Sequence, residues 1–127
     1  MMVDHTVVHF EIPADDVEKI SKFYGDLFGW RIQHVGWMDY WTVETVPTDE
    51  EGNPVRPGVN GGLMRRESPG QRPTNYISVE SAREYAAKIE ELGGTVIMPP
   101  EEIPNVGWVA VATDPEGNYF GMIESAR

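Results

Sequence analysis

The chain has 127 residues, a length typical of one domain with a core large enough to fold without a metal or a disulfide. It contains no cysteine, which excludes a disulfide scaffold, a cysteine nucleophile and thiolate metal sites. Its net charge of -11 disfavours binding to the phosphate backbone of nucleic acids. No apolar stretch reaches the length of a membrane span, and no signal peptide is visible. We therefore expect a cytoplasmic protein that binds neither nucleic acid nor membrane.

The first half of the chain predicts a strand, a helix and three further strands. Residues 5–12 alternate between apolar and polar side chains, as a half-buried strand does. A helix follows, because Asp15 and Asp16 are good N-cap residues and Gly29 suits a helix C-terminus. Three further strands are predicted at residues 30–35, 38–46 and 59–66, with a loop at residues 47–58, which are rich in Pro, Gly and acidic residues.

The same order returns after residues 67–73, which have the composition of a linker. A strand is predicted at residues 74–79, and Ser81 with Glu84 forms a capping box that opens a second helix. Further strands are predicted at residues 95–98, 107–113 and 119–124, with Pro99-Pro100 ending the first and a turn at residues 114–118 before the last. We therefore predict a single domain, residues 1–127, of two modules at about residues 5–66 and 74–125.

A β-α-β-β-β order that occurs twice predicts an α+β fold. A helix cannot bury its apolar stripe alone, so each helix should pack on one face of the strands of its own module. We expect the two modules to form a curved mixed sheet with the helices on the outside. The opposite face of that sheet would be a cup that can enclose a ligand.

Four short motifs lie along the chain, at residues 9–13 (HFEIP), 23–30 (FYGDLFGW), 91–94 (ELGG) and 114–118 (DPEGN). In this order and spacing they resemble motifs of the vicinal oxygen chelate superfamily, which includes glyoxalases, bleomycin-resistance proteins and extradiol dioxygenases. The resemblance implies the fold, and it implies a homodimer because relatives often pair their sheets. It does not specify a reaction, since members include lyases, isomerases, dioxygenases and antibiotic-binding proteins.

In metal-dependent members of this superfamily, the ligands come from the first and fourth strands of each half and are typically His, Glu or Gln. By this resemblance the four positions fall on His9, Gly61-Gly62, Thr74 and Gly121. Glycine has no side chain to donate and threonine is a poor ligand, so His9 is the only surviving candidate. No cofactor is therefore expected, and the alternative is a divalent metal held by His9 with Glu11 or Glu44.

Strand alternation assigns the side chains that should face the cup. His9 and Glu11 share one strand face and are a candidate catalytic acid-base pair. His9 is also a candidate for ligand binding or for a buried structural role. The other ligand-binding candidates come from several strands: Trp41, Met64, Arg66, Thr74, Tyr76, Trp108 and Tyr119. Alternation alone does not settle the directions of Tyr40, Trp41 and Trp108, and any of them could point into the cup.

We interpret the chain as a small-molecule-binding protein, similar to glyoxalases and bleomycin-resistance proteins but without the usual metal site. Its partners would be a small organic molecule and a second copy of the chain. Three alternatives stay open. The first is a metal-dependent lyase, isomerase or dioxygenase of the same superfamily, and the second is a metal-free acid-base enzyme that uses His9 and Glu11. The third is a structural or regulatory module whose cup is filled by its own aromatic side chains.

Overall fold

The computed structural model describes residues 3–126, which divide into two compact units. The N-terminal unit is His9–Pro73. The C-terminal unit combines residues 3–8 with residues 74–126. No helix among the described residues is long and apolar enough to cross a bilayer.

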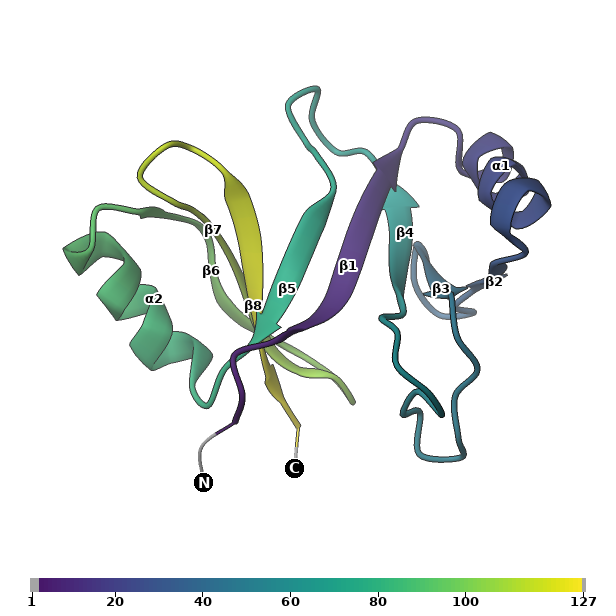
Figure 1. Ribbon diagram of the computed structural model, residues 1–127. Coiled ribbons are helices and arrows are strands. Elements are labelled where there is room, and N and C mark those ends of the chain that lie inside the picture. The colour runs from purple at the N-terminus through teal and green to yellow at the C-terminus, as the bar shows by residue number, and fades with distance from the viewer. Residues whose placement is uncertain (1–2, 127) are drawn as a thin grey trace. The chain divides into compact units, whose positions relative to one another are not determined.

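The N-terminal unit has the order strand, helix, strand, strand, strand (Figure 1). Its elements are β1 (Val7–Ala14, of which residues 9–14 belong to this unit), α1 (Val17–Phe28), β2 (Arg31–His34), β3 (Tyr40–Glu44) and β4 (Gly61–Arg65). The strand order in the sheet is β2-β3-β4-β1. Strands β4 and β1 pair in parallel, and the other neighbours are antiparallel.

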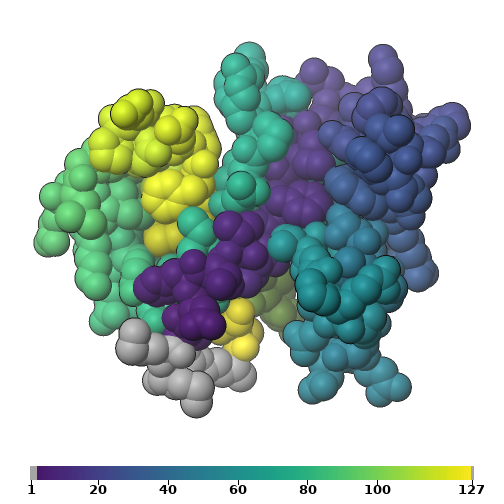
Figure 2. All heavy atoms as spheres, viewed as in Figure 1, coloured from purple at the N-terminus to yellow at the C-terminus, as the bar shows by residue number. Residues whose placement is uncertain are grey.

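The C-terminal unit repeats this order with β5 (Thr74–Ser78), α2 (Ala82–Glu91), β6 (Thr95–Ile103), β7 (Gly107–Thr113) and β8 (Tyr119–Ser125). Its strand order is β5-β8-β7-β6, again with one parallel pair, β5 with β8. The first described residues join this unit, because the Ser78 N–H donates to the Thr6 carbonyl at 3.0 Å. These residues are dark purple in Figure 2. The predicted α+β class and the two βαβββ repeats are thus confirmed.

Local capping places both helices where the sequence predicts them. The Asp16 side chain accepts the Lys19 N–H at 3.1 Å and begins α1, and Gly29 ends it with a left-handed φ of 73°. The Ser81 hydroxyl accepts the Glu84 N–H at 3.1 Å and begins α2. Each helix start is therefore determined by one short polar side chain.

One predicted strand end is wrong. Strand β6 does not stop at Pro99-Pro100 but continues to Ile103, with register shifts between Val96 and Met98 and between Met98 and Glu101. The prolines are tolerated because β6 is the last strand in the order of its unit, so one side of its backbone has no neighbouring strand of that unit to bond. The first strand also differs, since β1 begins at Val7 and runs through Pro13 to Ala14.

Each unit buries its own core between its helix and one face of its strands. In the N-terminal unit this core is Ala14, Val17, Val43 and Leu63, with Phe10 and Ile12 packed against it. In the C-terminal unit it is Val79, Ala82, Ala110 and Met122, with Phe120 packed against it. Val8, which has the same parity as Phe10 and Ile12 in β1, is 45% exposed. The alternate residues of the same strands must face away from the helices.

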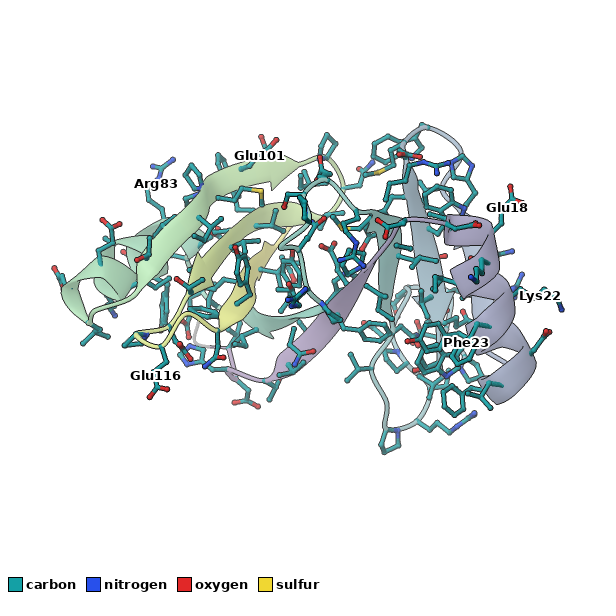
Figure 3. All side chains as sticks on the ribbon, turned by 90° about the horizontal axis from the view of Figure 1, so that it is seen from above. Glu18, Lys22, Phe23, Arg83, Glu101 and Glu116 are labelled. Atoms are coloured by element: carbon teal, nitrogen blue, oxygen red, sulfur yellow. The ribbon has the colours of Figure 1, made fainter. Side chains whose placement is uncertain are left out.

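One five-residue turn, D-x-E-G-N, occurs in both units between the third and fourth strands. The carboxylates of Asp49 and Asp114 each accept the backbone N–H groups two and four residues further on, at 2.9 to 3.0 Å. Gly52 and Gly117 share a φ of 85°. Figure 3 shows Glu116, from the middle of the second turn, projecting outward. The two units therefore repeat particular residues as well as the order of their elements. The sequence prediction had identified only the second of these two turns.

Candidate functional site

Three polar side chains of the N-terminal unit meet on the sheet face opposite α1. His9 and Glu11 lie on β1 and alternate with Phe10 and Ile12, which pack on the helix side. Tyr40 begins β3, and β4 lies between these two strands. The Tyr40 side chain reaches across β4 to bring its hydroxyl between His9 and Glu11. We call His9, Tyr40 and Glu11 the polar trio.

Hydrogen bonds determine where the protons of the polar trio lie. The Tyr40 hydroxyl donates to Glu11 Oε2 at 2.9 Å, and His9 Nε2 lies 2.8 Å from the same hydroxyl oxygen. The phenol has one proton and gives it to the carboxylate, so the bond to His9 requires the proton to be on Nε2. His9 Nε2 is 3.6 Å from Glu11 Oε2, so the phenol is the main link between imidazole and carboxylate.

Gly62 on β4 makes room for this arrangement. In the sheet register Glu11 and Thr42 flank Gly62, while Tyr40 is paired with Met64. The Tyr40 ring therefore leans diagonally over Gly62. A Cβ atom on Gly62 would overlap the Tyr40 hydroxyl, well inside the 3.0 Å that real Cβ atoms keep from other atoms. No larger residue fits at position 62 while the phenol keeps its place.

The C-terminal unit contains a comparable pair. Tyr76 on β5 is the register partner of Gly121 on β8. A Cβ atom on Gly121 would lie closer than 3.0 Å to three carbons of the Tyr76 ring. Tyr76 is 6% exposed and Thr74, two residues earlier on the same strand, is 9% exposed. Both of these sequence-predicted candidates are therefore buried on the face of β5 that carries Tyr76.

The predicted tryptophans lie on the helix side of their sheets. Trp41 packs against the core beneath α1, and Trp108 packs against the core beneath α2 with the Arg83 guanidinium 5.8 Å from its ring. Alternation explains this placement, because Trp41 has the same parity as the buried Val43 and Trp108 the same parity as the buried Ala110. A ligand-binding role for either tryptophan stays a prediction.

The other predicted residues have separate positions. Arg66 holds the segment after β4, since it donates to Asp15 Oδ1 at 3.1 Å, to the Pro13 carbonyl and to the Gln71 carbonyl. Met64 is half-buried on β4 as the register partner of Tyr40. Tyr119 begins β8 and is 41% exposed.

Sequence reasoning left the direction of Tyr40 open and did not predict that it joins His9 and Glu11, although two signals for this placement were present. Trp41 and Val43 are the apolar positions of their strand, which leaves Tyr40 and Thr42 for the opposite face. The glycine pair on the next strand indicates a close approach by another group. Taken together, these signals assign an aromatic hydroxyl to the face that carries His9.

The superfamily resemblance implies a divalent metal, and the side chains of the described residues do not fit one. Among residues 3–126 no group of three His, Cys, Asp or Glu side chains is placed to hold a metal ion. His9 Nε2 is bonded to Tyr40, and the glycine at position 62 cannot be replaced by a ligand residue without displacing the phenol. The Glu44 carboxylate, considered as an extra ligand, accepts the Thr48 hydroxyl at 3.3 Å.

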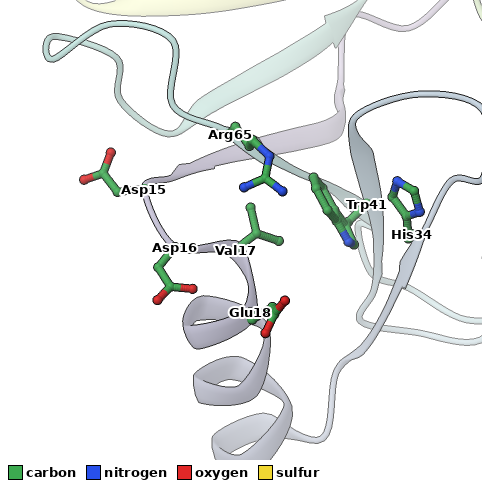
Figure 4. A pocket seen from close by; sticks show the side chains of 7 residues that line it. All are labelled: Asp15, Asp16, Val17, Glu18, His34, Trp41 and Arg65. Carbon is green, nitrogen blue, oxygen red and sulfur yellow. The ribbon is translucent and has the colours of Figure 1, made fainter.

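A separate hollow of about 490 Å³ lies on the α1 side of the N-terminal unit (Figure 4). It is lined by Asp15, Asp16, Val17, Glu18, His34, Trp41 and Arg65. The Arg65 guanidinium lies 5.3 Å from the centre of the Trp41 ring, and the His34 ring lies 5.0 Å from it. Arg65 also pairs with the exposed Asp39 at 3.2 Å. Because Trp41 and the polar trio lie on opposite faces of the sheet, this hollow is not part of the trio.

Comparisons with known proteins agree with this architecture. A family model described as bleomycin resistance protein-like N-terminal matches residues 6–45. CFP32 of Mycobacterium tuberculosis, a protein described as a glyoxylase candidate, is 41% identical over 69 residues, which cover 52% of this chain and 26% of that protein. The anthracycline biosynthesis protein DnrV of Streptomyces peucetius is 27% identical over 132 residues, 93% of this chain and 48% of that protein. The chain thus spans only about a quarter to a half of these two relatives.

A third relative, a glyoxylase-like domain-containing protein of Didymella fabae, is 27% identical over 128 residues, with 96% of this chain and 95% of that protein aligned. Among solved structures, methylmalonyl-CoA epimerase from Mycobacterium tuberculosis has a TM-score of 0.67 at 13% identity, covering 100% of this chain and 94% of the other. The hypothetical protein BH1468 from Bacillus halodurans has a TM-score of 0.66 at 16% identity, covering 98% and 97%. At these identities the structures show a shared fold and nothing about the reaction.

The chain is an α+β protein of paired βαβββ units with a polar trio on the sheet face opposite the helix. Its resemblance to the vicinal oxygen chelate superfamily, which the motifs predicted, is supported by the bleomycin resistance protein-like family model over residues 6–45 and by similarity to glyoxylase-like proteins.

Proposed function

We propose that this chain binds a small organic molecule through the polar trio and without a divalent metal. The observation that carries this proposal is the Tyr40 hydroxyl, bonded to His9 and Glu11 above the bare backbone of Gly62. A few converging polar groups beside apolar surface are typical of small-molecule sites. The His9 and Glu11 side chains keep 29% and 21% of their surface exposed, which supports access by a ligand.

The polar trio favours a ligand that carries oxygen atoms. An imidazole, a phenol and a carboxylate offer both donors and acceptors, and their mutual hydrogen bonds hold them in one geometry before a ligand arrives. The names of related proteins are consistent with such ligands. DnrV is an anthracycline biosynthesis protein. The structure of methylmalonyl-CoA epimerase from Streptomyces coelicolor, which has a TM-score of 0.65 to this chain, is a complex with 2-nitronate-propionyl-CoA.

The first test is ligand binding by chelator-treated protein without a histidine tag. Bleomycin, daunorubicin and methylmalonyl-CoA are screened by thermal shift, and any hit is measured by calorimetry. Tyr40→Phe should weaken binding about tenfold or more, since it removes the hydroxyl that joins His9 and Glu11. Tyr24→Phe is the matched control, because Tyr24 contributes a ring stacked on Trp30 at 5.0 Å. Equal effects of the two changes would contradict a binding role for the trio.

Metal content is measured on the same protein. A stoichiometric metal ion that is lost on His9→Ala would contradict the proposal and favour a metal-dependent lyase, isomerase or dioxygenase. Weak binding of Zn²⁺, Ni²⁺ or Mn²⁺ that is unchanged by His9→Ala would support a site without metal.

A second candidate function, metal-free acid-base catalysis, is favoured by the continuity of the hydrogen bonds from His9 through Tyr40 to Glu11. Such a series of hydrogen bonds can accept a proton from a carbon atom next to a carbonyl group, with Glu11 or His9 as the base. The test is deuterium exchange at the α-carbon of methylmalonyl-CoA, followed by NMR. Glu11→Gln should slow exchange about a hundredfold or more in a folded protein. If the wild-type protein catalyses no exchange on this substrate, binding remains the better proposal.

The expected homodimer and cytoplasmic location remain predictions. Sedimentation velocity tests the first, since a species of twice the chain mass supports a dimer and a species of the chain mass contradicts it.

A further inference from the structure

Gly62 and Gly121 both lie inside strands, where a glycine weakens the strand and needs a reason. Backbone conformation is not that reason, because neither residue is among the glycines with a positive φ. Both are buried, and at both a Cβ atom would overlap a tyrosine of the same unit. The two glycines are therefore required for space.

The tyrosines come from a neighbouring strand in each case. Tyr40 leans from β3 over Gly62 on β4, and Tyr76 packs from β5 on Gly121 of β8. These glycines occupy two of the four positions that the superfamily resemblance assigns to metal ligands. In each unit an aromatic ring thus fills the space that a ligand side chain would need.

We propose that two tyrosine–glycine pairs, Tyr40 with Gly62 and Tyr76 with Gly121, replace metal-ligand side chains and close both positions to a divalent ion. In the N-terminal unit the replacement also engages the surviving ligand candidate, since the Tyr40 hydroxyl is bonded to His9 Nε2. Removal of a carboxylate ligand alone would leave a vacant position at a metal site. When a phenol fills that position instead, the effect on stability of a change at the glycine depends on whether the tyrosine is present.

The mutual dependence is measured by a double-mutant cycle on the melting temperature of the full chain. Gly62→Ala alone should lower the melting temperature by about 8 °C, since the added methyl group overlaps the Tyr40 hydroxyl. The same change in the Tyr40→Ala protein should lower it by less than about 2 °C, because the obstacle is gone. Gly36→Ala is the control, since a Cβ atom there meets no atom within 4 Å, and its effect should be the same with or without Tyr40.

A second measurement tests whether the tyrosine–glycine pair stands in the place of a metal-ligand side chain. The Tyr40→Ala, Gly62→Glu double variant should bind Zn²⁺ at least about tenfold more tightly than the wild-type protein, and adding His9→Ala should abolish the gain. Calorimetry on chelator-treated protein gives the affinities, and far-UV circular dichroism confirms the fold. The Tyr76→Ala and Gly121→Ala cycle repeats the stability test in the C-terminal unit.

Each outcome decides the proposal, and none requires knowledge of the organic ligand. Coupling in both cycles together with the gain of Zn²⁺ binding supports it. An equal cost of Gly62→Ala with and without the phenol overturns it, as does a folded double variant that gains no Zn²⁺ affinity. Stoichiometric, His9-dependent metal binding by the wild-type protein also overturns it. A failure of the ligand screen would contradict the proposed function and leave these results unchanged, whereas His9-dependent metal binding by the wild-type protein would contradict both proposals.

Discussion

The Tyr40 hydroxyl donates to the Glu11 carboxylate at 2.9 Å although the two residues lie on β3 and β1, which are separated by β4. The phenol spans the intervening strand because the residue beneath it is Gly62. One long side chain and one missing side chain together connect polar groups that the sheet would otherwise keep apart. The stability of the N-terminal unit should depend on this link.

Tyr40→Phe should lower the free energy of unfolding by about 1 to 3 kcal/mol, because it removes the hydroxyl shared by His9 and Glu11 while keeping the ring. Urea denaturation followed by tryptophan fluorescence measures the change. Tyr24→Phe is the control and should change the free energy by less than about 0.5 kcal/mol, since Tyr24 acts through ring stacking. A Tyr40→Phe protein as stable as the control would show that water replaces the hydroxyl without cost.

Glu80 should make the C-terminal unit sensitive to acid. Its own backbone N–H, the Val3 N–H at 3.0 Å and the His5 ring at 3.2 Å favour the charged carboxylate and lower the pKa of Glu80 to about 2, from 4.5. A depressed pKa contributes stability that is complete above pH 4.5 and is lost as the pH falls toward 2. The urea midpoint of the wild-type protein should therefore fall over this range, and Glu80→Gln should flatten the fall.

The control for this acid sensitivity is Glu90→Gln on the exposed side of α2, which should leave the pH dependence of the midpoint as it is in the wild-type protein. A Glu80→Gln protein with the full wild-type dependence between pH 5 and pH 2 would assign the acid sensitivity to other carboxyl groups.

Adjacent aspartates before α1 should differ in their effect on stability. Asp16→Ala should cost about 1 kcal/mol, because its carboxylate caps the helix by accepting the Lys19 N–H. Asp15→Ala should cost less than about 0.5 kcal/mol, because the 82% exposed Asp15 makes a surface ion pair with Arg66. Thermal and urea denaturation of both variants checks the order. A larger cost for Asp15→Ala would mean that the ion pair, rather than the cap, holds this end of the helix.

The two D-x-E-G-N turns should respond alike to alanine. Gly52→Ala and Gly117→Ala should each destabilise the protein by about 1 kcal/mol, because both glycines have a φ of 85°, where a Cβ atom is strained. Gly70→Ala is the control, since no positive φ and no neighbouring atom opposes a methyl group there. Melting curves of the three variants measure the difference. A different loss of stability in the two variants would show that the turns share their sequence but not their contribution to stability.

Most of the fold could be predicted from the sequence because its signals are local. The alternation in β1, the caps at Asp16 and Ser81 and the positive φ at Gly29 each depend on residues close together in the chain. The prediction failed at Pro99-Pro100, where the outcome depends on whether a neighbouring strand needs the missing N–H. Strand position in a sheet is not a local property.

The candidate site likewise has features that nearby residues determine and features that depend on the arrangement of whole strands. The sequence alone determined that His9 and Glu11 share a strand face, because side chains two residues apart point the same way. By the superfamily resemblance, the sequence also predicted glycines at positions where metal-dependent members have ligands. Only the tertiary structure decided what fills the space above Gly62. Tyr40 is 31 residues from His9 in the chain, and the register of β3, β4 and β1 brings its hydroxyl to that position. Register arises from the packing of whole strands, so no short stretch of sequence encodes it.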